Sequence, residues 1–327
     1  SPYNKWAFHH VRELVPSANI QNNPSQVQNP SYKEFDFSAV NVELDDQSQV
    51  TYDEFLEITD TDALVVLKDG IIIEERYFKG MTRDTPHILM SVSKSILGLL
   101  TGILIDQKIF KAQDKACAIL PELTSTAYNE ATIRDLLDMR TGVNFIEDYL
   151  ATSGLMIDYR KATNWNPLEN SEAPSDLRSF YHLLDKKNHP DGQRFNYVSP
   201  NSDLLGWIIE RSTGERFSDL LSDLFWKPLG AIMPSYITVD RLGAPRVAGG
   251  LCTTAIDLAL VGQLFLDNGF TNGQQILPRN WLQDIQKNGS RDAWLEGNFV
   301  EYFPNMDMHY RSKWYVDHGS NDSKAEL

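Results

Sequence analysis

The longest apolar stretch of the chain runs from Ser95 to Ile105, where hydrophobic side chains fall on nearly every side of a helix. A helix that is apolar all round is normally buried, so we expect a central core helix here. The apolar character extends back to Ile88, which makes residues 88–105 the sole candidate for a membrane span. This segment contains Lys94, and a charge inside a span is costly. We therefore expect a buried helix and no membrane insertion.

Two shorter apolar stretches precede this helix, from Asp62 to Leu67 and from Ile71 to Phe78. They are separated by Lys68-Asp69-Gly70, and two strand-like runs around an Asp-Gly pair predict a β-hairpin. Residues 1–62 combine several prolines with asparagine and glutamine, which indicates an irregular polar lead-in.

The rest of the chain is mostly helical in its periodicity. We expect helices at 132–139, 175–186, 201–212, 217–226, 254–268 and 278–287, β-like or loop structure at 236–255, and a last strand at 309–316. Ser175 after Pro174 is a helix-start signal, whereas Gly214 and Pro228 are expected to end helices.

This order of elements predicts an α+β protein in which an antiparallel sheet is flanked by helices. We expect residues 1–110 and 236–327 to form a sheet-containing domain, with residues 111–235 inserted as a mostly helical domain. A cleft between two such domains is a natural position for an active site.

Composition narrows the class of protein without identifying it. The chain has 327 residues, of which 42% are hydrophobic and 23% charged, as in ordinary globular proteins. Its net charge of -15 disfavours binding to nucleic acid and to anionic membranes, because both require basic patches. Cys117 and Cys252 are too few for a disulfide scaffold and leave one bridge or none. No Cys/His cluster has zinc-site spacing, so we expect no metal and no cofactor.

The strongest chemical signal is Ser91-Val92-Ser93-Lys94, which opens the core helix. Residues three apart share a helix face, so the Ser91 hydroxyl and the Lys94 amine are expected to lie within one turn. A serine hydroxyl needs a base to become a nucleophile, and burial lowers the pKa of a lysine toward the range where it is one. The alternative is that Ser91 serves only as a helix cap.

A second candidate group is Tyr197, in a loop that leads into the predicted helix at 201–212. A phenol at such a position shuttles protons where nearby cations stabilise its phenolate. The alternative is that Tyr197 only packs, as most tyrosines do.

In this arrangement the chain resembles the penicillin-recognising serine hydrolases, which include class C β-lactamases, DD-peptidases and related esterases. The resemblance rests on residues 91–94, on Phe195-Asn196-Tyr197-Val198-Ser199, and on segments 204–214 and 248–259. Further details are similar to the 6-aminohexanoate-dimer (nylon oligomer) hydrolase branch: segments 4–8, 15–18, 89–95, 137–139 and 147–149, and the Tyr-x-Ser form at Tyr197 and Ser199.

The resemblance implies a β-lactamase/DD-peptidase-like fold and a role for each matching residue. Ser91 is then the acylated nucleophile, Lys94 its base or base partner, and Tyr197 the acid/base group that protonates the leaving group. Ser199 and Tyr149 contact the substrate, Tyr149 at the leaving-group nitrogen, although a loop tyrosine without a role is the alternative. The oxyanion hole uses the Ser91 N–H and a second N–H from a strand beside the site.

The chain departs from the family pattern in two places. His318-Gly319-Ser320 has the form of the third motif, Lys/His-x-Gly, but lies in a polar stretch expected to be a loop. We therefore expect the true third motif, and the C-terminal strands and helix, to be missing from this chain. Ser199 stands where class C β-lactamases carry Asn, which argues against efficient β-lactam turnover.

The resulting hypothesis is a serine hydrolase that cleaves small amides or esters through an acyl-enzyme on Ser91. One alternative is a carboxylesterase or D-amino-acid peptidase without amidase activity on oligomers. Another is a non-catalytic module that binds peptides or wall fragments. The expected partner is a small-molecule amide or ester, and a homodimer stays open. The first residue is Ser1 and no leader is visible, which favours a periplasmic or secreted location over a cytoplasmic one without deciding it.

Overall fold

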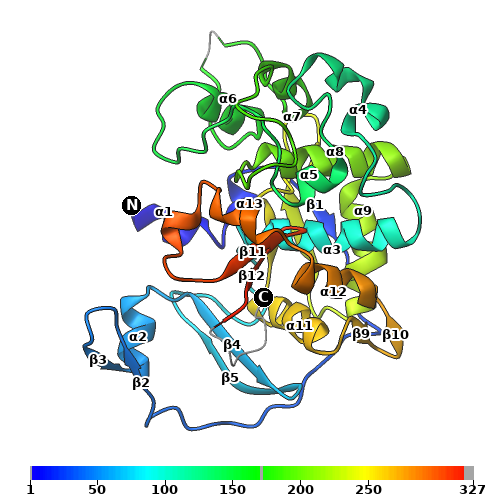
Figure 1. Ribbon diagram of the computed structural model, residues 1–327. Helices are drawn as coiled ribbons and strands as arrows, with labels where there is room; N and C mark the ends of the chain where they lie inside the picture. The colour runs from blue at the N-terminus through cyan, green and yellow to red at the C-terminus, as the bar shows by residue number, and fades with distance from the viewer. Residues whose placement is uncertain (1, 170–171, 320–327) are drawn as a thin grey trace.

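A computed structural model describes residues 2–169 and 172–319 (Figure 1). The predicted core helix is helix α3 (Val92–Asp106), and the prediction is confirmed because most of its residues are buried, Lys94 among them. Within the described residues, none of the helices combines the length and apolarity needed to cross a bilayer. Both cysteine thiols are free.

The main sheet has four antiparallel strands in the order β1, β7, β8, β6. These strands are β1 (Ser17–Ile20), β7 (Ser235–Thr238), β8 (Leu251–Thr253) and β6 (His87–Ile88). Strand β6 leads directly into α3, so the sheet fixes the position of Ser91. The prediction that residues 1–62 are irregular is wrong for β1, which pairs with β7 from Ser17↔Thr238 to Ile20↔Ser235.

The predicted hairpin is confirmed as β4 (Ala63–Lys68) and β5 (Ile71–Tyr77). Its turn residues Asp69 and Gly70 both have positive φ, at 53° and 74°, as a two-residue turn between twisted strands requires. A small unit precedes it, made of β2 (Asn41–Glu43), β3 (Gln49–Thr51) and α2 (Tyr52–Ile58). The N-terminal segment contains α1 (Pro2–Ala7) and the short 3₁₀ helix η1 (Val11–Glu13).

The middle of the chain is helical, as expected. It comprises α4 (Ala116–Ile119), η2 (Pro121–Ser125), α5 (Ile133–Leu137), α6 (Leu155–Ala162), α7 (Leu177–Phe180), η3 (Tyr181–Leu183), α8 (Pro200–Thr213), α9 (Phe217–Leu221), η4 (Ser222–Trp226) and α10 (Lys227–Leu229). Helix α8 ends at Gly214 with φ 75°, as predicted.

Two predicted helices in this region have different bounds. The helix expected at 175–186 is capped by Asp176, whose side chain accepts from the Ser179 N–H, and it ends much earlier. The helix expected to stop before Pro228 continues through the π-helical turn η4 into α10, which has Pro228 in its first turn.

The C-terminal part returns beside the core helix. It contains α11 (Ala255–Leu266), β9 (Phe270–Thr271), β10 (Gln274–Gln275), α12 (Arg279–Lys287), α13 (Arg291–Leu295), η5 (Val300–Tyr302), β11 (Met308–Arg311) and β12 (Trp314–Asp317). The single strand predicted at 309–316 is wrong. It is a hairpin, with Ser312 and Lys313 at positive φ in the turn.

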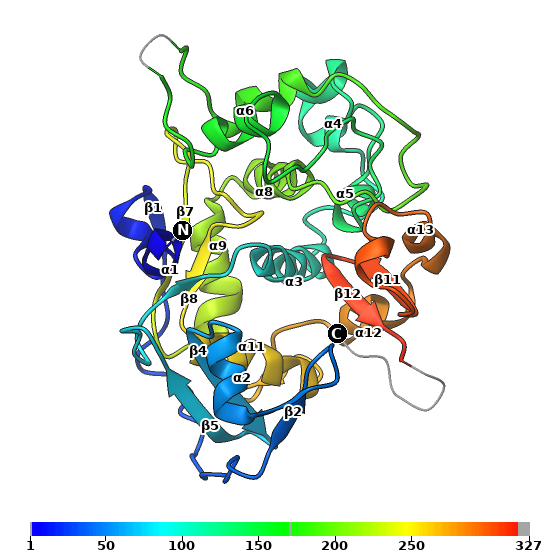
Figure 2. The same ribbon diagram turned by 90° about the vertical axis from the view of Figure 1, so that its left-hand side faces the viewer.

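The layers of the molecule are arranged around α3 (Figure 2). In that view α4, α5, α6 and α8 lie above it, and the β4–β5 hairpin lies below with α2 and α11. The β7–β8 sheet lies to one side and the β11–β12 hairpin to the other. The N-terminal end of α3 is therefore surrounded by segments from all parts of the chain. The α+β architecture agrees with the sequence, while the domain boundaries at 110 and 235 stay a prediction.

Candidate active site

Ser91 lies at the N-terminus of α3, immediately after the sheet. The chain turns at Met90, whose φ is 45°, and the preceding Leu89 N–H donates to the Leu251 carbonyl at 2.8 Å. A non-glycine residue in this conformation is uncommon and is held by its surroundings. Ser91 itself is exposed, and its Oγ accepts a hydrogen bond from Lys94 Nζ at 2.9 Å instead of capping the helix.

Lys94 is a buried amine with two hydrogen bonds. Only 2% of the residue is exposed, and Nζ also donates to the Ala248 carbonyl at 2.6 Å. Burial lowers the pKa of Lys94 to about 8, against the opposing attraction of Glu147. The neutral amine, which is the form that accepts a proton, is then far more populated near neutral pH than in an exposed lysine.

Tyr197 is the second side chain that interacts with the side chain of Ser91. Its side chain is buried and shares a hydrogen bond with that of Ser91, and Lys94 Nζ lies 5.0 Å from the centre of its ring. Burial raises the pKa of Tyr197 and outweighs the hydrogen bond to Ser91, which lowers it. The stable form is therefore the phenol, in contrast to the phenolate considered from the sequence. A phenol can donate a proton, and the neutral amine of Lys94 is the neighbouring group able to accept one.

Glu147 links the two remaining residues that the sequence singled out. Its carboxylate accepts from the Ser199 N–H at 2.6 Å and from the Ser199 Oγ at 2.5 Å. Tyr149, which is 56% exposed, donates from its hydroxyl to the same carboxylate at 2.8 Å. Charge-assisted hydrogen bonds of this kind are strong, so Glu147 fixes both hydroxyls. This role could not be predicted from local sequence, because only folding brings residue 147 to residue 199.

A buried charged network reaches Lys94 through the backbone of Ala248, and its members were not predicted from the sequence. Asp203, on α8, accepts from Arg246 at 2.6 Å and from the Tyr159 hydroxyl at 2.5 Å through Oδ2, and its Oδ1 accepts from the Ala248 N–H at 2.8 Å. The backbone of Ala248 therefore connects the two side chains: its N–H donates to Asp203, and its carbonyl accepts from Lys94. A charged residue in an otherwise buried stretch of helix is costly unless paired, and that signal was available in the sequence.

The expected oxyanion hole requires backbone N–H groups that are free to donate to a substrate oxygen. Among the described residues, the Ser91 N–H has no recorded acceptor, and it lies at the helix N-terminus where the dipole favours negative charge. The His318 N–H already donates to the Asp307 backbone carbonyl at 2.8 Å, and the Gly319 N–H donates to the Asp317 carboxylate at 3.0 Å. The third residue of that candidate motif, Ser320, lies outside the described residues.

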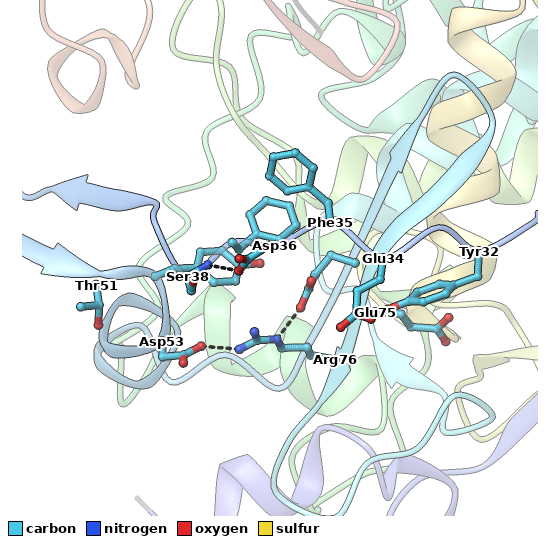
Figure 3. A pocket seen from close by; sticks show the side chains of 12 residues that line it. Tyr32, Glu34, Phe35, Asp36, Ser38, Thr51, Asp53, Glu75 and Arg76 are labelled. Atoms are coloured by element: carbon cyan, nitrogen blue, oxygen red, sulfur yellow. Dashed lines mark hydrogen bonds and ion pairs between the residues drawn. The ribbon is translucent and has the colours of Figure 1, made fainter.

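A hollow of about 700 Å³ lies away from these residues, beside β5 (Figure 3). Aromatic and acidic side chains line it around Arg76, whose guanidinium bonds to Asp53 and Glu74. The described residues that line it include neither Ser91 nor Lys94. In the part of the chain that the structure describes, no three His, Cys, Asp or Glu side chains are grouped so as to hold a metal ion.

Comparison with known proteins places this site in a family. A model of the family described as Beta-lactamase matches residues 59–297, well over half of the chain. The chain belongs to the beta-lactamase family. A 6-aminohexanoate-dimer hydrolase of Paenarthrobacter ureafaciens is 32% identical over 316 residues, covering 96% of this chain and 77% of that protein. A D-aminopeptidase of Brucella anthropi is 26% identical over 176 residues, covering 51% of this chain and 31% of that protein.

Solved structures agree with this assignment. One, named as a 6-aminohexanoate-dimer hydrolase from Bacillus anthracis, has a TM-score of 0.87 and 26% identity, and covers 98% of this chain and 81% of that one. A penicillin-binding protein homologue from Pyrococcus abyssi has a TM-score of 0.60 at 14% identity over 80% of this chain and 63% of that one, and shares the fold. The predicted fold class and resemblance are confirmed, and this beta-lactamase family member is a serine hydrolase.

Proposed function

We propose that this serine hydrolase cleaves small amides or esters through an acyl-enzyme on Ser91. The observation that carries the proposal is the 2.9 Å hydrogen bond between the Ser91 hydroxyl and the buried amine of Lys94. This pairs a nucleophile with a base whose pKa suits proton transfer near neutral pH.

The acylation step follows from this geometry. Neutral Lys94 takes the Ser91 proton while Oγ attacks the substrate carbonyl carbon, giving a tetrahedral intermediate with a negative oxygen. That oxygen faces the Ser91 N–H. The carbon–nitrogen or carbon–oxygen bond then breaks, Tyr197 gives its proton to the departing atom, and the Lys94 ammonium restores the proton of Tyr197. Water attacks the acyl-enzyme in the same way, which releases the carboxylic acid and regenerates Ser91.

Both curated relatives support an amide substrate through their names, one for hydrolysing a dimer of 6-aminohexanoate and the other as a D-aminopeptidase. A carboxylesterase is the second candidate, because exposed Ser91 with a buried base suits esters equally well. A non-catalytic binding module has less support, since it gives no reason to bury an amine against a serine hydroxyl.

A fluorophosphonate probe tests the nucleophile directly. We expect one covalent label per chain at Ser91, because its hydroxyl is both exposed and paired with a base. Peptide mass spectrometry locates the label. Ser91→Ala should remove it, whereas Ser95→Ala, one helix turn further on, should leave it. A label at another serine, or none on the folded protein, contradicts the proposal.

The pH profile tests the base. We expect kcat/KM for a small ester to rise about tenfold per pH unit on the acidic side and to level off above about pH 8, as Lys94 loses its proton. Glu147 raises the pKa of Lys94, so Glu147→Gln should move the midpoint to lower pH. Glu215→Gln, at an exposed glutamate, is the matched control and should not move it. A midpoint that moves upward in Glu147→Gln contradicts this role for Lys94.

A further inference from the structure

An apolar hollow of about 420 Å³ lies next to the nucleophile, and the mechanism above does not use it. Its lining comes from three places in the sequence. The N-terminal segment provides Phe8, Val11 and Leu14, the end of the sheet provides Ile88 and Met90, and the loop after α6 provides Trp165. Among the described residues that line it, none carries a charged side chain.

The hollow adjoins the site along the chain, at Met90. This residue lines the hollow, directly precedes Ser91, and has a φ of 45°. The N-terminal wall is fixed to the same strand, because the Ile88 N–H donates to the Phe8 carbonyl at 2.9 Å. Val11 and Ile88 are each 5% exposed and form the floor, whereas Leu14 and Met90 are 57% and 37% exposed and form the rim.

The hollow and Tyr197 belong to different parts of the core. Tyr197 packs in a buried cluster with Phe195 and Trp294, whereas Val11 and Ile88 pack in another, and within the described residues the two clusters have no member in common. A leaving group must be near Tyr197 to receive its proton. The other half of the substrate becomes attached to Ser91, and Met90, directly before Ser91, lines the hollow.

We propose that this hollow binds the acyl part of the substrate, and that its lining selects a neutral apolar acyl chain. The inference rests on the proposed function, because it takes Ser91 as the acylated residue. Each methylene that leaves water for an apolar site favours binding, so an alkyl chain gains with length until the hollow is full. A charged acyl group has no counterion there and loses its hydration.

A series of p-nitrophenyl esters from acetate to decanoate tests this selectivity. We expect kcat/KM to rise roughly threefold to fourfold per methylene through the short members and to level off once the chain fills the hollow. Leu14→Asp places a charge on the rim, and we expect it to lower the ratio of kcat/KM for octanoate to that for acetate by about tenfold. Leu242→Asp, at another exposed leucine that is 64% exposed, is the matched control and should leave the ratio unchanged.

Binding of n-octanol by isothermal titration calorimetry gives a readout that does not depend on turnover. We expect octanol to bind the native protein and to bind Leu14→Asp about tenfold more weakly, with both proteins shown to be folded by circular dichroism. A ratio that Leu14→Asp does not change, or octanol binding equal in both proteins, overturns the inference. Weakened octanol binding without hydrolysis of any ester overturns the proposed function but supports the hollow as a binding site.

Discussion

Replacing Lys94 with methionine is expected to lower kcat/KM for p-nitrophenyl acetate by roughly 10²–10⁴-fold, the usual contribution of a positioned acid–base group. The Ser91 hydroxyl then lacks its 2.9 Å partner and stays protonated. Methionine has a similar length and is apolar, so the buried space around Nζ stays filled. The variant should therefore remain folded, and a circular dichroism spectrum and thermal unfolding curve check this.

The matched control for this prediction is Lys227→Met, at a lysine whose side chain is 38% exposed and paired with Asp223 on the surface. Surface ion pairs of this kind contribute little, so activity and stability should both be retained. If Lys94→Met keeps more than about a tenth of the native activity, another group is the base and the assignment of Lys94 is wrong.

Replacing Asp203 with alanine is expected to lower the free energy of unfolding by about 3–5 kcal/mol. The carboxylate is almost completely buried and pairs with Arg246 at 2.6 Å. Its removal leaves the guanidinium buried without a counterion and removes the hydrogen bonds to the Tyr159 hydroxyl and the Ala248 N–H. Urea-induced unfolding measures the change. Asp223→Ala removes a carboxylate from an exposed pair and should cost about 0.5 kcal/mol or less.

The same substitution has a second readout that loss of stability alone does not produce. Asp203 raises the pKa of Lys94 through its negative charge, whereas Arg246 lowers it. Asp203→Ala therefore leaves the unfavourable charge of Arg246 opposed by Glu147 without Asp203, and the midpoint of the pH profile should move to lower pH. A weakened protein with an unchanged midpoint would show that Asp203 supports the fold without influencing the base.

Local sequence patterns predicted an element correctly where its structure depends mainly on its own residues. The run from Ser95 to Ile105 is apolar on all sides and is the buried helix α3. The Asp-Gly pair at 69–70 adopts the positive φ angles that its hairpin needs. Gly214 ends α8 in the left-handed conformation that glycine adopts most easily.

The same reasoning failed where distant partners decide the structure. Strand β1 has only four residues, and its regular structure depends on pairing with β7, more than two hundred positions later. The β11–β12 turn places Ser312 and Lys313 at positive φ, where neither residue type is usual. Because the usual Asn-Gly or Asp-Gly turn signal is absent, the sequence predicted a single strand. Lys313 is buried there, and its amine donates to the Leu136 carbonyl at 2.6 Å.

The sequence alone predicts that Ser91 and Lys94 share one turn of a buried helix, because helical spacing sets the distance between residues three apart. It also indicated Tyr197 and the family through the order of its motifs. The electrostatics of the site arise only in the folded protein, since the pKa of Lys94 depends on burial and on Glu147, Asp203 and Arg246. Glu147, Asp203 and Arg246 lie on segments that meet at α3 only after folding, so their effect on a proton at Lys94 is a property of three-dimensional distance.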